Sequence, residues 1–279
     1  MIQRFVTLTL LGALCLTSSC QHATHESNTS VKKETLVPLV AQERELNPHG
    51  SFFTAERMPD TFIENVGPVA TYRFIARKFP QEQVYVLASQ SLGGTPQPVA
   101  RYEVDDEGHL GRQIEAGTLM LDNEMILMFD YFKGEPVEYW LCSSDSTSRL
   151  GTSFVPYPIS TEAKDGAILS VRRLTQDAGL VLLEGTDFNP DEQIVVGSQV
   201  GNKRTPNVPV RCRNGRFSMI FEPKCDDKTG GTAYIDVMRA NERLMLEYDW
   251  GCEAVNPKRR QGNTSRIRPD ALINLPTDL

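Results

Sequence analysis

The stretch that decides the fold is Gly185-Thr-Asp-Phe188-Asn-Pro190-Asp-Glu192-Gln-Ile194-Val-Val196. Phe188 is a large apolar residue among polar neighbours, Pro190 fixes φ for a turn, and an apolar run begins at Ile194. These features predict two β-strands joined by a turn whose Phe closes one end of an apolar core. The carboxylate of Glu192 is expected to face water or to cap the turn.

A second copy of this pattern lies earlier in the chain. Phe79-Pro80-Gln-Glu82-Gln83-Val84-Tyr-Val86 aligns with the stretch from Phe188, with one residue inserted between Phe and Pro in the later copy. At an offset of 107 to 109, Ser89-Gln90 then aligns with Ser198-Gln199 and Gly108 with Gly215, and Val137–Leu141 falls near Arg243–Tyr248. A repeat of this length indicates two copies of one domain fold.

Short apolar or alternating runs, separated by turn residues such as Gly93-Gly94 and Asn214-Gly215, recur through both halves. Short strands at roughly 8–12-residue spacing are typical of an all-β sandwich or barrel. Strands are expected at Tyr72–Arg77, Gln83–Ala88, Val99–Val104, Thr118–Leu121, Met125–Phe132 and Val137–Leu141, and at Leu180–Gly185, Gln193–Ser198, Val208–Arg213, Arg216–Phe221, Ala233–Met238 and Arg243–Tyr248.

The stretch from Gly185 to Val196 resembles the early part of bacterial immunoglobulin-like (Ig-like) domains, in which Gly-x-x-Phe-x-Pro-x-Glu/Asp joins two strands. The first half keeps Phe79, Pro80 and Glu82 but has Ala76-Arg77-Lys78 in place of Gly-Thr-Asp. The resemblance implies two tandem Ig-like β-sandwiches, at residues 51–160 and 161–256, with a linker-like join near Pro156–Gly166. It concerns the fold and says nothing of activity.

Alternation along the expected strands selects candidate core residues. In the first sandwich these are Phe79, Val84, Val86, Leu127, Phe129 and Trp140; in the second they are Phe188, Ile194, Val196, Phe217, Ile235, Val237, Leu244 and Leu246.

The first 19 residues have the order of a secretory signal: a positive end with Arg4, an apolar run from Phe5 to Leu16, and small residues before Cys20. The apolar run is shorter than the ~20 residues of a membrane-spanning helix. Leu16-Thr-Ser-Ser-Cys20 resembles the lipobox of bacterial lipoproteins, which implies lipid attachment to Cys20 and cleavage before it. An Asp directly after the lipidated Cys would favour the inner membrane, but this chain has Gln21 there. We therefore expect an outer-membrane location, with the protein facing the periplasm or the cell surface.

The segments at the two ends of the expected sandwiches are polar. Residues 20–50 are expected to form a tether, and residues 257–279 form a tail with five cations between Lys258 and Arg268. The tail is interpreted as a solvated segment, with a basic arm for an anionic partner as the alternative. The full chain has a formal net charge of −7, and removal of the signal with its single Arg gives −8. This acidic balance gives no reason to expect a nucleic-acid partner.

Four cysteines follow Cys20, namely Cys142, Cys212, Cys225 and Cys252. In an oxidising compartment, a disulfide between Cys212 and Cys225 is the first hypothesis, because these residues flank the expected hairpin through Asn214-Gly215, and Cys225–Cys252 is its rival. The intervals of 12 and 26 residues between these three cysteines do not suit a zinc site.

Residues that could carry chemistry are few. His109 is the one histidine inside an expected sandwich, in a turn where it should be exposed. The acidic run from Glu103 to Gly108 could form either a hairpin turn or a calcium site. A hairpin turn is the better explanation, because it also suits Arg-Asn-Gly215 at the same place in the second copy. No catalytic residue, metal or cofactor is therefore expected.

The leading hypothesis is a non-enzymatic, membrane-anchored envelope protein that binds another macromolecule, a protein or a glycan, through sandwich-end loops or a sheet edge. One alternative is a carbohydrate-binding module with Trp140 or Trp250 as an aromatic platform, although both residues lie in expected strands where core packing is favoured. A second alternative is a hydrolase with a site between the sandwiches.

Overall fold

The computed structural model describes residues 47–262, except Glu82, 115–116, 225–227 and Asn241. The expected signal, most of the tether, and the tail beyond Gly262 therefore lie outside the described residues. The described chain is built from β-strands and two short 3₁₀ turns, η1 (Leu121–Asn123) and η2 (Pro257–Arg259). Within it, neither helical turn has the length and apolar character needed to cross a membrane.

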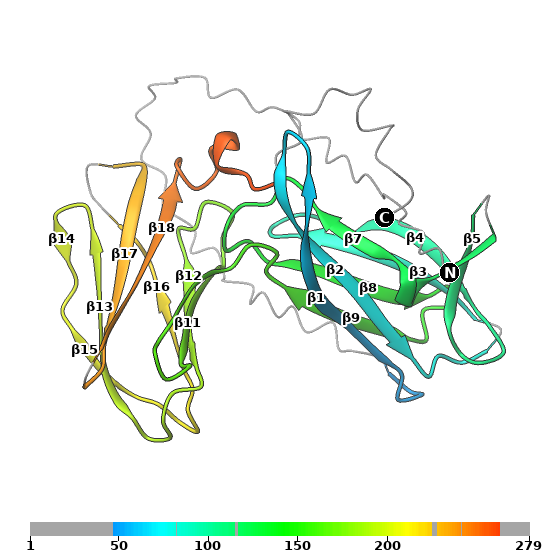
Figure 1. The fold of residues 1–279 in the computed structure, drawn as a ribbon, viewed down its shortest axis with the longest axis horizontal. Coiled ribbons are helices and arrows are strands. Elements are labelled where there is room, and N and C mark those ends of the chain that lie inside the picture. Colours follow the sequence, from blue (N-terminus) through cyan, green and yellow to red (C-terminus); the bar gives the residue numbers. More distant parts are fainter. Residues whose placement is uncertain (1–46, 82, 115–116, 225–227, 241, 263–279) are drawn as a thin grey trace, which may run out of the picture.

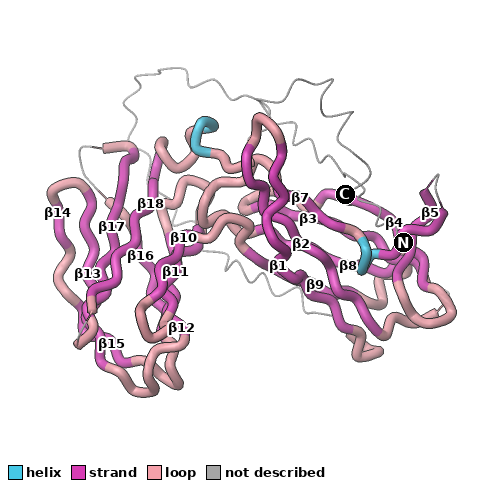
Figure 2. Tube along the Cα trace, in the orientation of Figure 1, coloured by secondary structure: helices cyan, strands magenta, loops and turns pink. Residues whose placement is uncertain are grey.

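The first sandwich packs a three-stranded sheet against a six-stranded one (Figures 1 and 2). The three-stranded sheet has the order β1 (Phe52–Ile63), β2 (Gly67–Arg77), β7 (Met125–Met128). The six-stranded sheet has the order β6 (Gly117–Met120), β5 (Leu110–Ile114), β4 (Gln97–Val104), β3 (Val84–Ser91), β8 (Val137–Ser143), β9 (Arg149–Phe154). Both sheets contribute to one core that includes Phe74, Tyr85, Leu87, Tyr139 and Leu141.

The second sandwich has its own core, which includes Leu183, Ile194, Ile235 and Leu246. One sheet has the order β10 (Ile159–Glu162), β11 (Ile168–Arg173), β12 (Val181–Thr186), β16 (Phe217–Phe221). The other has the order β14 (Lys203–Arg204), β13 (Gln193–Val200), β17 (Gly230–Met238), β18 (Arg243–Gly251), and β15 (Val208–Arg211) also pairs with β13.

Both sandwiches share the strand order of the immunoglobulin fold. The first, second and fifth strands of that fold form one sheet, and the third, sixth and seventh form the other. These roles are taken by β1, β2, β7 and β3, β8, β9 in the first sandwich, and by β11, β12, β16 and β13, β17, β18 in the second. The predicted fold class, all-β with two tandem Ig-like sandwiches, is confirmed.

The two copies of the Phe turn are alike in backbone detail. Lys78 and Asp187, the residues before each Phe, both adopt a left-handed conformation, with φ of 61° and 59°. Gly108 and Gly215 also have positive φ, and a Cβ at either position would crowd the carbonyl oxygen of Phe79 or Phe188, at 3.1 and 2.6 Å. Glycine is thus required at both positions for two reasons, backbone conformation and space.

Two details of the predicted alignment are wrong. The constant offset of 109 continues from Phe79 into β3 without an inserted residue, so Tyr85 corresponds to Ile194, and both are buried. In addition, β8 corresponds to β17, because each pairs with the third strand of its sandwich, and does not correspond to β18.

The core prediction succeeds in the second sandwich. Seven of its eight residues are buried, and Phe217 is partly buried against Phe188, with ring centroids 5.4 Å apart. In the first sandwich Phe79 is buried as expected, but the other five residues are only half-buried: Val84, Val86, Leu127, Phe129 and Trp140. Their neighbours Tyr85, Leu87, Met128, Tyr139 and Leu141 occupy the core instead. A one-residue slip exchanges the two faces of a strand, and the apolar residues on both faces of β3 conceal it.

The two sandwiches meet at the ends that lie opposite Phe79 and Phe188 (Figure 1). Between the two sandwiches the chain forms the extra strand β10, which pairs antiparallel with β11 at the edge of the second sandwich. The join is not the expected free linker: Tyr157 donates a hydrogen bond to Met128 O at 2.7 Å, and β10 is paired in the second sandwich.

Candidate functional site: the Trp140 face and the domain junction

The outward surface of β3, β8 and β9 carries apolar side chains where a solvated sheet usually has polar ones. We call it the Trp140 face, formed by Val84, Val86, Ala88, Trp140, Cys142, Arg149 and Gly151. In the strand register Val86 lies opposite Cys142, which lies opposite Arg149; one step along, Ala88 lies opposite Trp140, which lies opposite Gly151. All seven residues are half-buried, so the face is a shallow and closely packed surface.

The indole of Trp140 is held in a stack. A Cβ at position 151 would overlap the indole ring, so glycine allows the ring to lie across β9. The guanidinium carbon of Arg149 lies 4.3 Å from the ring centroid, in cation–π contact. The indole Nε1 is buried and has no hydrogen-bond partner among the described residues. This layered arrangement fixes the position of both large side chains.

Polar side chains border the Trp140 face. Gln90 lies opposite Glu138, next to Trp140 along β8, and exposed Arg101 lies opposite Val86. Tryptophan and arginine are the residue types that most often dominate binding energy at protein interfaces, and a polar rim around an apolar centre is typical of such sites. Sequence alternation missed this face because it assigned Val84, Val86 and Trp140 to the core.

The second sandwich has a different surface at the equivalent place. There Gly197 lies opposite Asp236, which lies opposite Met245. Trp250, the other candidate aromatic platform, is buried in the second core, as the core interpretation predicted. At the place of Trp140 the second sandwich thus has Asp236, and the aromatic residue on that surface is Tyr234, two positions away along β17 and opposite Gln199 and Glu247.

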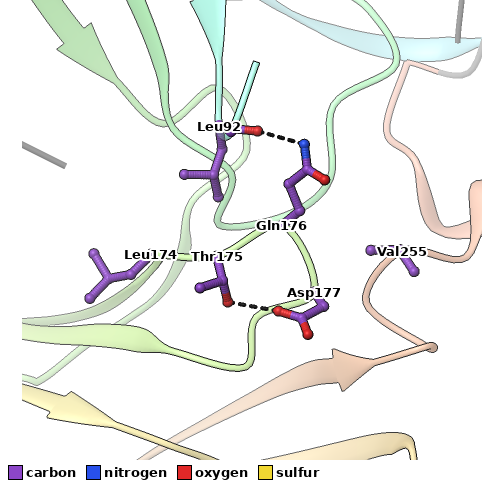
Figure 3. A pocket seen from close by; sticks show the side chains of 7 residues that line it. Leu92, Leu174, Thr175, Gln176, Asp177 and Val255 are labelled. Carbon is purple, nitrogen blue, oxygen red and sulfur yellow. Dashed lines mark hydrogen bonds between the residues drawn. The ribbon is translucent and has the colours of Figure 1, made fainter. Parts of the chain in front are cut away.

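A groove of about 520 Å³ lies at the junction of the sandwiches (Figure 3). It is lined by Leu92 and Gly93 from the turn after β3, by Leu174–Asp177 from the loop after β11, and by Val255. The amide of Gln176 donates to Leu92 O at 2.9 Å and joins the two walls, and the hydroxyl of Thr175 donates to the Asp177 carboxylate at 2.7 Å. The volume is that of a small-ligand site, and the groove is open to solvent.

Glu192, the carboxylate of the fold-deciding stretch, has two roles in the structure. Its Oε2 accepts a hydrogen bond from the backbone N–H of Asn189 at 3.1 Å, which caps the turn as expected. It also pairs with Arg239 at 2.7 Å, and Arg239 forms a two-bond pair with Asp165 and lies over the ring of Phe188. One guanidinium thus ties together three loops at the Phe188 end. It holds the pKa of Asp165 at about 2 and lowers the pKa of Glu192 by hydrogen bonding to both carboxylates.

Replacing Arg239 by Met should lower the free energy of unfolding of the second sandwich by roughly 2 kcal/mol at neutral pH, because it leaves the largely buried Glu192 carboxylate without its partner. The stabilisation exists above the unfolded carboxyl pKa, near 4, and disappears as pH falls through the lowered folded values towards 2. Denaturant unfolding between pH 2 and 7 should therefore show a shallower acid decline in the variant.

Arg243→Met is the matched control, since Arg243 is exposed and pairs with Asp236 on the outer surface. Its effect should stay within about 0.5 kcal/mol. Equal effects of the two substitutions, or an unchanged acid decline in Arg239→Met, would contradict the role given to Arg239.

The remaining nominated residues lie apart from these surfaces. His109 is exposed in the turn after β4, with Nδ1 3.4 Å from the Asp105 carboxylate. Asp105, Glu107 and His109 have potential ligand atoms within 4.8 Å of one another, but Asp105 accepts the backbone N–H groups of Glu107 and His109 and so belongs to the turn. These backbone hydrogen bonds lower the pKa of Asp105.

Cys20 and Cys225 lie outside the described residues, so the predicted disulfide between Cys212 and Cys225 stays a prediction. Cys212 is buried beside Glu192, at the Phe188 end of the second sandwich. Cys252 is exposed at the other end, where Gly251 pairs with Gly230 at the start of β17 and where β16 also ends. In the sequence, Cys225 lies between β16 and β17. The end of β16 and the start of β17 are at the Cys252 end of the sandwich and not at the Cys212 end, which favours the rival pairing of Cys225 with Cys252.

No family model and no curated protein sequence matches the chain. Among solved structures, the chain is similar to a tetra-tandem repeat in the extending region of a large adhesion protein, at 15% sequence identity and a TM-score of 0.24. The match covers 73% of this chain and 50% of that one, so the chain spans half the length of that structure. At this TM-score the likeness carries no argument about function.

Proposed function

We propose that the protein is an exported lipoprotein of the cell envelope, anchored through Cys20, that binds a protein partner through the Trp140 face. The observation that carries the proposal is the stack of Gly151, Trp140 and Arg149 on the outward surface of the first sandwich. An aromatic side chain already fixed in position loses little conformational entropy on binding, so less of the free energy gained by burying its apolar surface is offset.

The tether favours the same arrangement. Ser51, at the start of the folded part, donates a hydrogen bond to Lys78 O at the Phe79 end of the first sandwich. A tether that precedes this residue and carries the lipid would hold the folded part by that end. The Trp140 face lies on the side of the sandwich, so a tether attached at its end leaves the face accessible to a neighbouring envelope protein.

One observation supports the carbohydrate-binding alternative: Trp140 lies on a sheet surface beside the planar side-chain groups of Gln90 and Glu138. However, the guanidinium of Arg149 lies over the indole ring that a sugar would need for stacking. Recognition by the paired Trp and Arg side chains suits a protein interface better.

Cross-linking in intact cells, with capture of the full lipidated chain, tests the proposal through Trp140→Ala. Loss of a Trp hot spot costs at least about 2 kcal/mol, so affinity for the partner should fall roughly 30-fold and recovery of the partner should fall with it. Met245→Ala is the matched control, since it changes an exposed apolar residue at the equivalent place on the second sandwich. Recovery that is equal for both variants would overturn the protein-binding proposal. Trp140-dependent pelleting with purified envelope glycan, without a captured protein, would replace it by the carbohydrate alternative.

A further inference from the structure

After its last strand, β18, the chain passes from the second sandwich back to the first (Figure 1). Gln261 forms an antiparallel bridge with Tyr131, donating its backbone N–H to Tyr131 O at 2.7 Å. The backbone N–H of Asp130 donates to Gly262 O at 3.3 Å, and Arg260 Nη1 donates to Asp130 O at 3.0 Å. Within the expected basic tail, Arg260, Gln261 and Gly262 are therefore docked on the first sandwich and are not solvated, while Pro257, Lys258 and Arg259 are exposed.

Phe132, in the turn after β7, lies between two guanidinium groups. The guanidinium carbon of Arg260 is 4.7 Å from its ring centroid, and that of Arg173 is 5.1 Å away. Arg260 comes from the segment after β18 and Arg173 from the end of β11, while Phe132 belongs to the first sandwich. One aromatic ring thus contacts both the second sandwich and the segment that follows it.

Arg173 is buried, with only 4% of its surface exposed, and it connects three parts of the chain. It donates to Lys133 O of the first sandwich at 2.8 Å, to Gln176 O of the second at 3.1 Å, and to Ala254 O after β18 at 2.9 Å. The nearby Glu135 carboxylate compensates its charge. Burial raises the pKa of Glu135, which the charges of Arg173 and Arg260 counteract. Buried charges of this kind persist only where such partners are fixed in place.

Two glycines permit the close approach at this junction. Gly134 has φ of 75°, and a Cβ there would lie 2.9 Å from Ile159 Cδ1, at the start of the second sandwich. Gly262 has φ of 60°, and its Cβ would lie 2.9 Å from the Tyr157 hydroxyl and 3.0 Å from Met128 O. The two sandwiches are thus closely packed at both places where the chain passes between them: at the join, near Ile159, and after β18, near Gly262.

We propose that residues 252–262 act as a strap that fixes the angle between the two sandwiches, with Arg260 as its latch on Phe132. A single linker between domains permits rotation about the join, and relative motion is the default for such pairs. Arg173 and Gln176 already bind the first sandwich, and the strap adds a further attachment at a separate point, Asp130–Phe132, which removes the remaining freedom to hinge. The two sandwiches then present their surfaces at a fixed angle to each other.

The distance between the two free ends of the molecule measures this rigidity. Spin labels can be placed through unnatural amino acids at exposed Glu107, near the Phe79 end, and at exposed Arg213, near the Phe188 end. The full chain in detergent should give one narrow distance distribution by pulsed electron resonance. In Arg260→Ala the distribution should widen roughly twofold, because the latch and its backbone contact are lost.

Arg259→Ala is the matched control. Arg259 is the adjacent cation of the strap, but its partners belong to the second sandwich: Asp249 lies in β18, and Glu253 lies just after that strand. This variant should keep the narrow distribution. A stop codon after Val255 removes the part of the strap that reaches the first sandwich and should give the widest distribution, with circular dichroism confirming that both sandwiches remain folded. A narrow distribution in the truncated chain, or the same width for Arg260→Ala and Arg259→Ala, would overturn the proposal.

Discussion

Phe188→Ala should lower the free energy of unfolding of the second sandwich by about 3–5 kcal/mol, a large part of the ~5–15 kcal/mol that stabilises a domain. Phe188 is 4% exposed, packs edge-on against Phe217 and lies beneath the guanidinium of Arg239. Its removal therefore leaves a cavity and also takes away the surface on which Arg239 rests. Thermal and denaturant unfolding, followed by the fluorescence of buried Trp250, should show an early transition.

Phe62→Ala is the matched control, because Phe62 is 76% exposed at the tip of the β1–β2 hairpin. It should change stability by no more than about 0.5 kcal/mol. The first sandwich has a separate core, so its own transition should survive Phe188→Ala. It should nevertheless shift slightly downwards, since unfolding of the second sandwich releases the contacts of Arg173 and Arg260. One cooperative transition, lowered as a whole, would contradict two independent cores.

Cys20→Ala should move the protein from the membrane fraction to the soluble fraction. One acyl chain holds a protein only marginally, and several hold it firmly, at ~0.8 kcal/mol for each buried CH₂ group, so loss of the modified residue should abolish the anchor. Fractionation of cells and mass spectrometry of the amino terminus measure the effect. Cys15→Ala, which changes a cysteine inside the expected signal, should leave the protein at the membrane. An unmodified amino terminus at another residue would refute the lipoprotein proposal.

The all-β class, the repeat and the core of the second sandwich could be predicted from the sequence alone. That success has a local cause. In β18 the buried positions Leu244, Leu246, Tyr248 and Trp250 alternate with outward positions that are charged except for Met245, so alternation identifies the buried face. The Phe turn begins with a local feature, the left-handed Asp187 directly before Phe188, and its Gly215 could be noted because the same glycine recurs as Gly108 in the first copy.

The tertiary structure alone decided which face of β3 and β8 is buried. Val84 and Val86 alternate with Tyr85 and Leu87, so both faces are apolar, and a pattern with a period of two cannot distinguish them. The answer depends on which set meets the opposite sheet, where Phe74 packs against Tyr139 with ring centroids 4.8 Å apart. The same decision placed Trp140 on the outside and created the candidate binding surface.

The strap was also invisible in the sequence, although its residues were noticed. A run of cations after the last strand has the composition of a solvated tail, and Arg260 lies 128 positions from the aromatic ring that it contacts. Composition and local pattern indicate only whether a residue type usually lies in solvent or in a core. The partners of a charged side chain are set by which surfaces the fold brings together, and here the segment after β18 lies against the turn after β7 of the first sandwich.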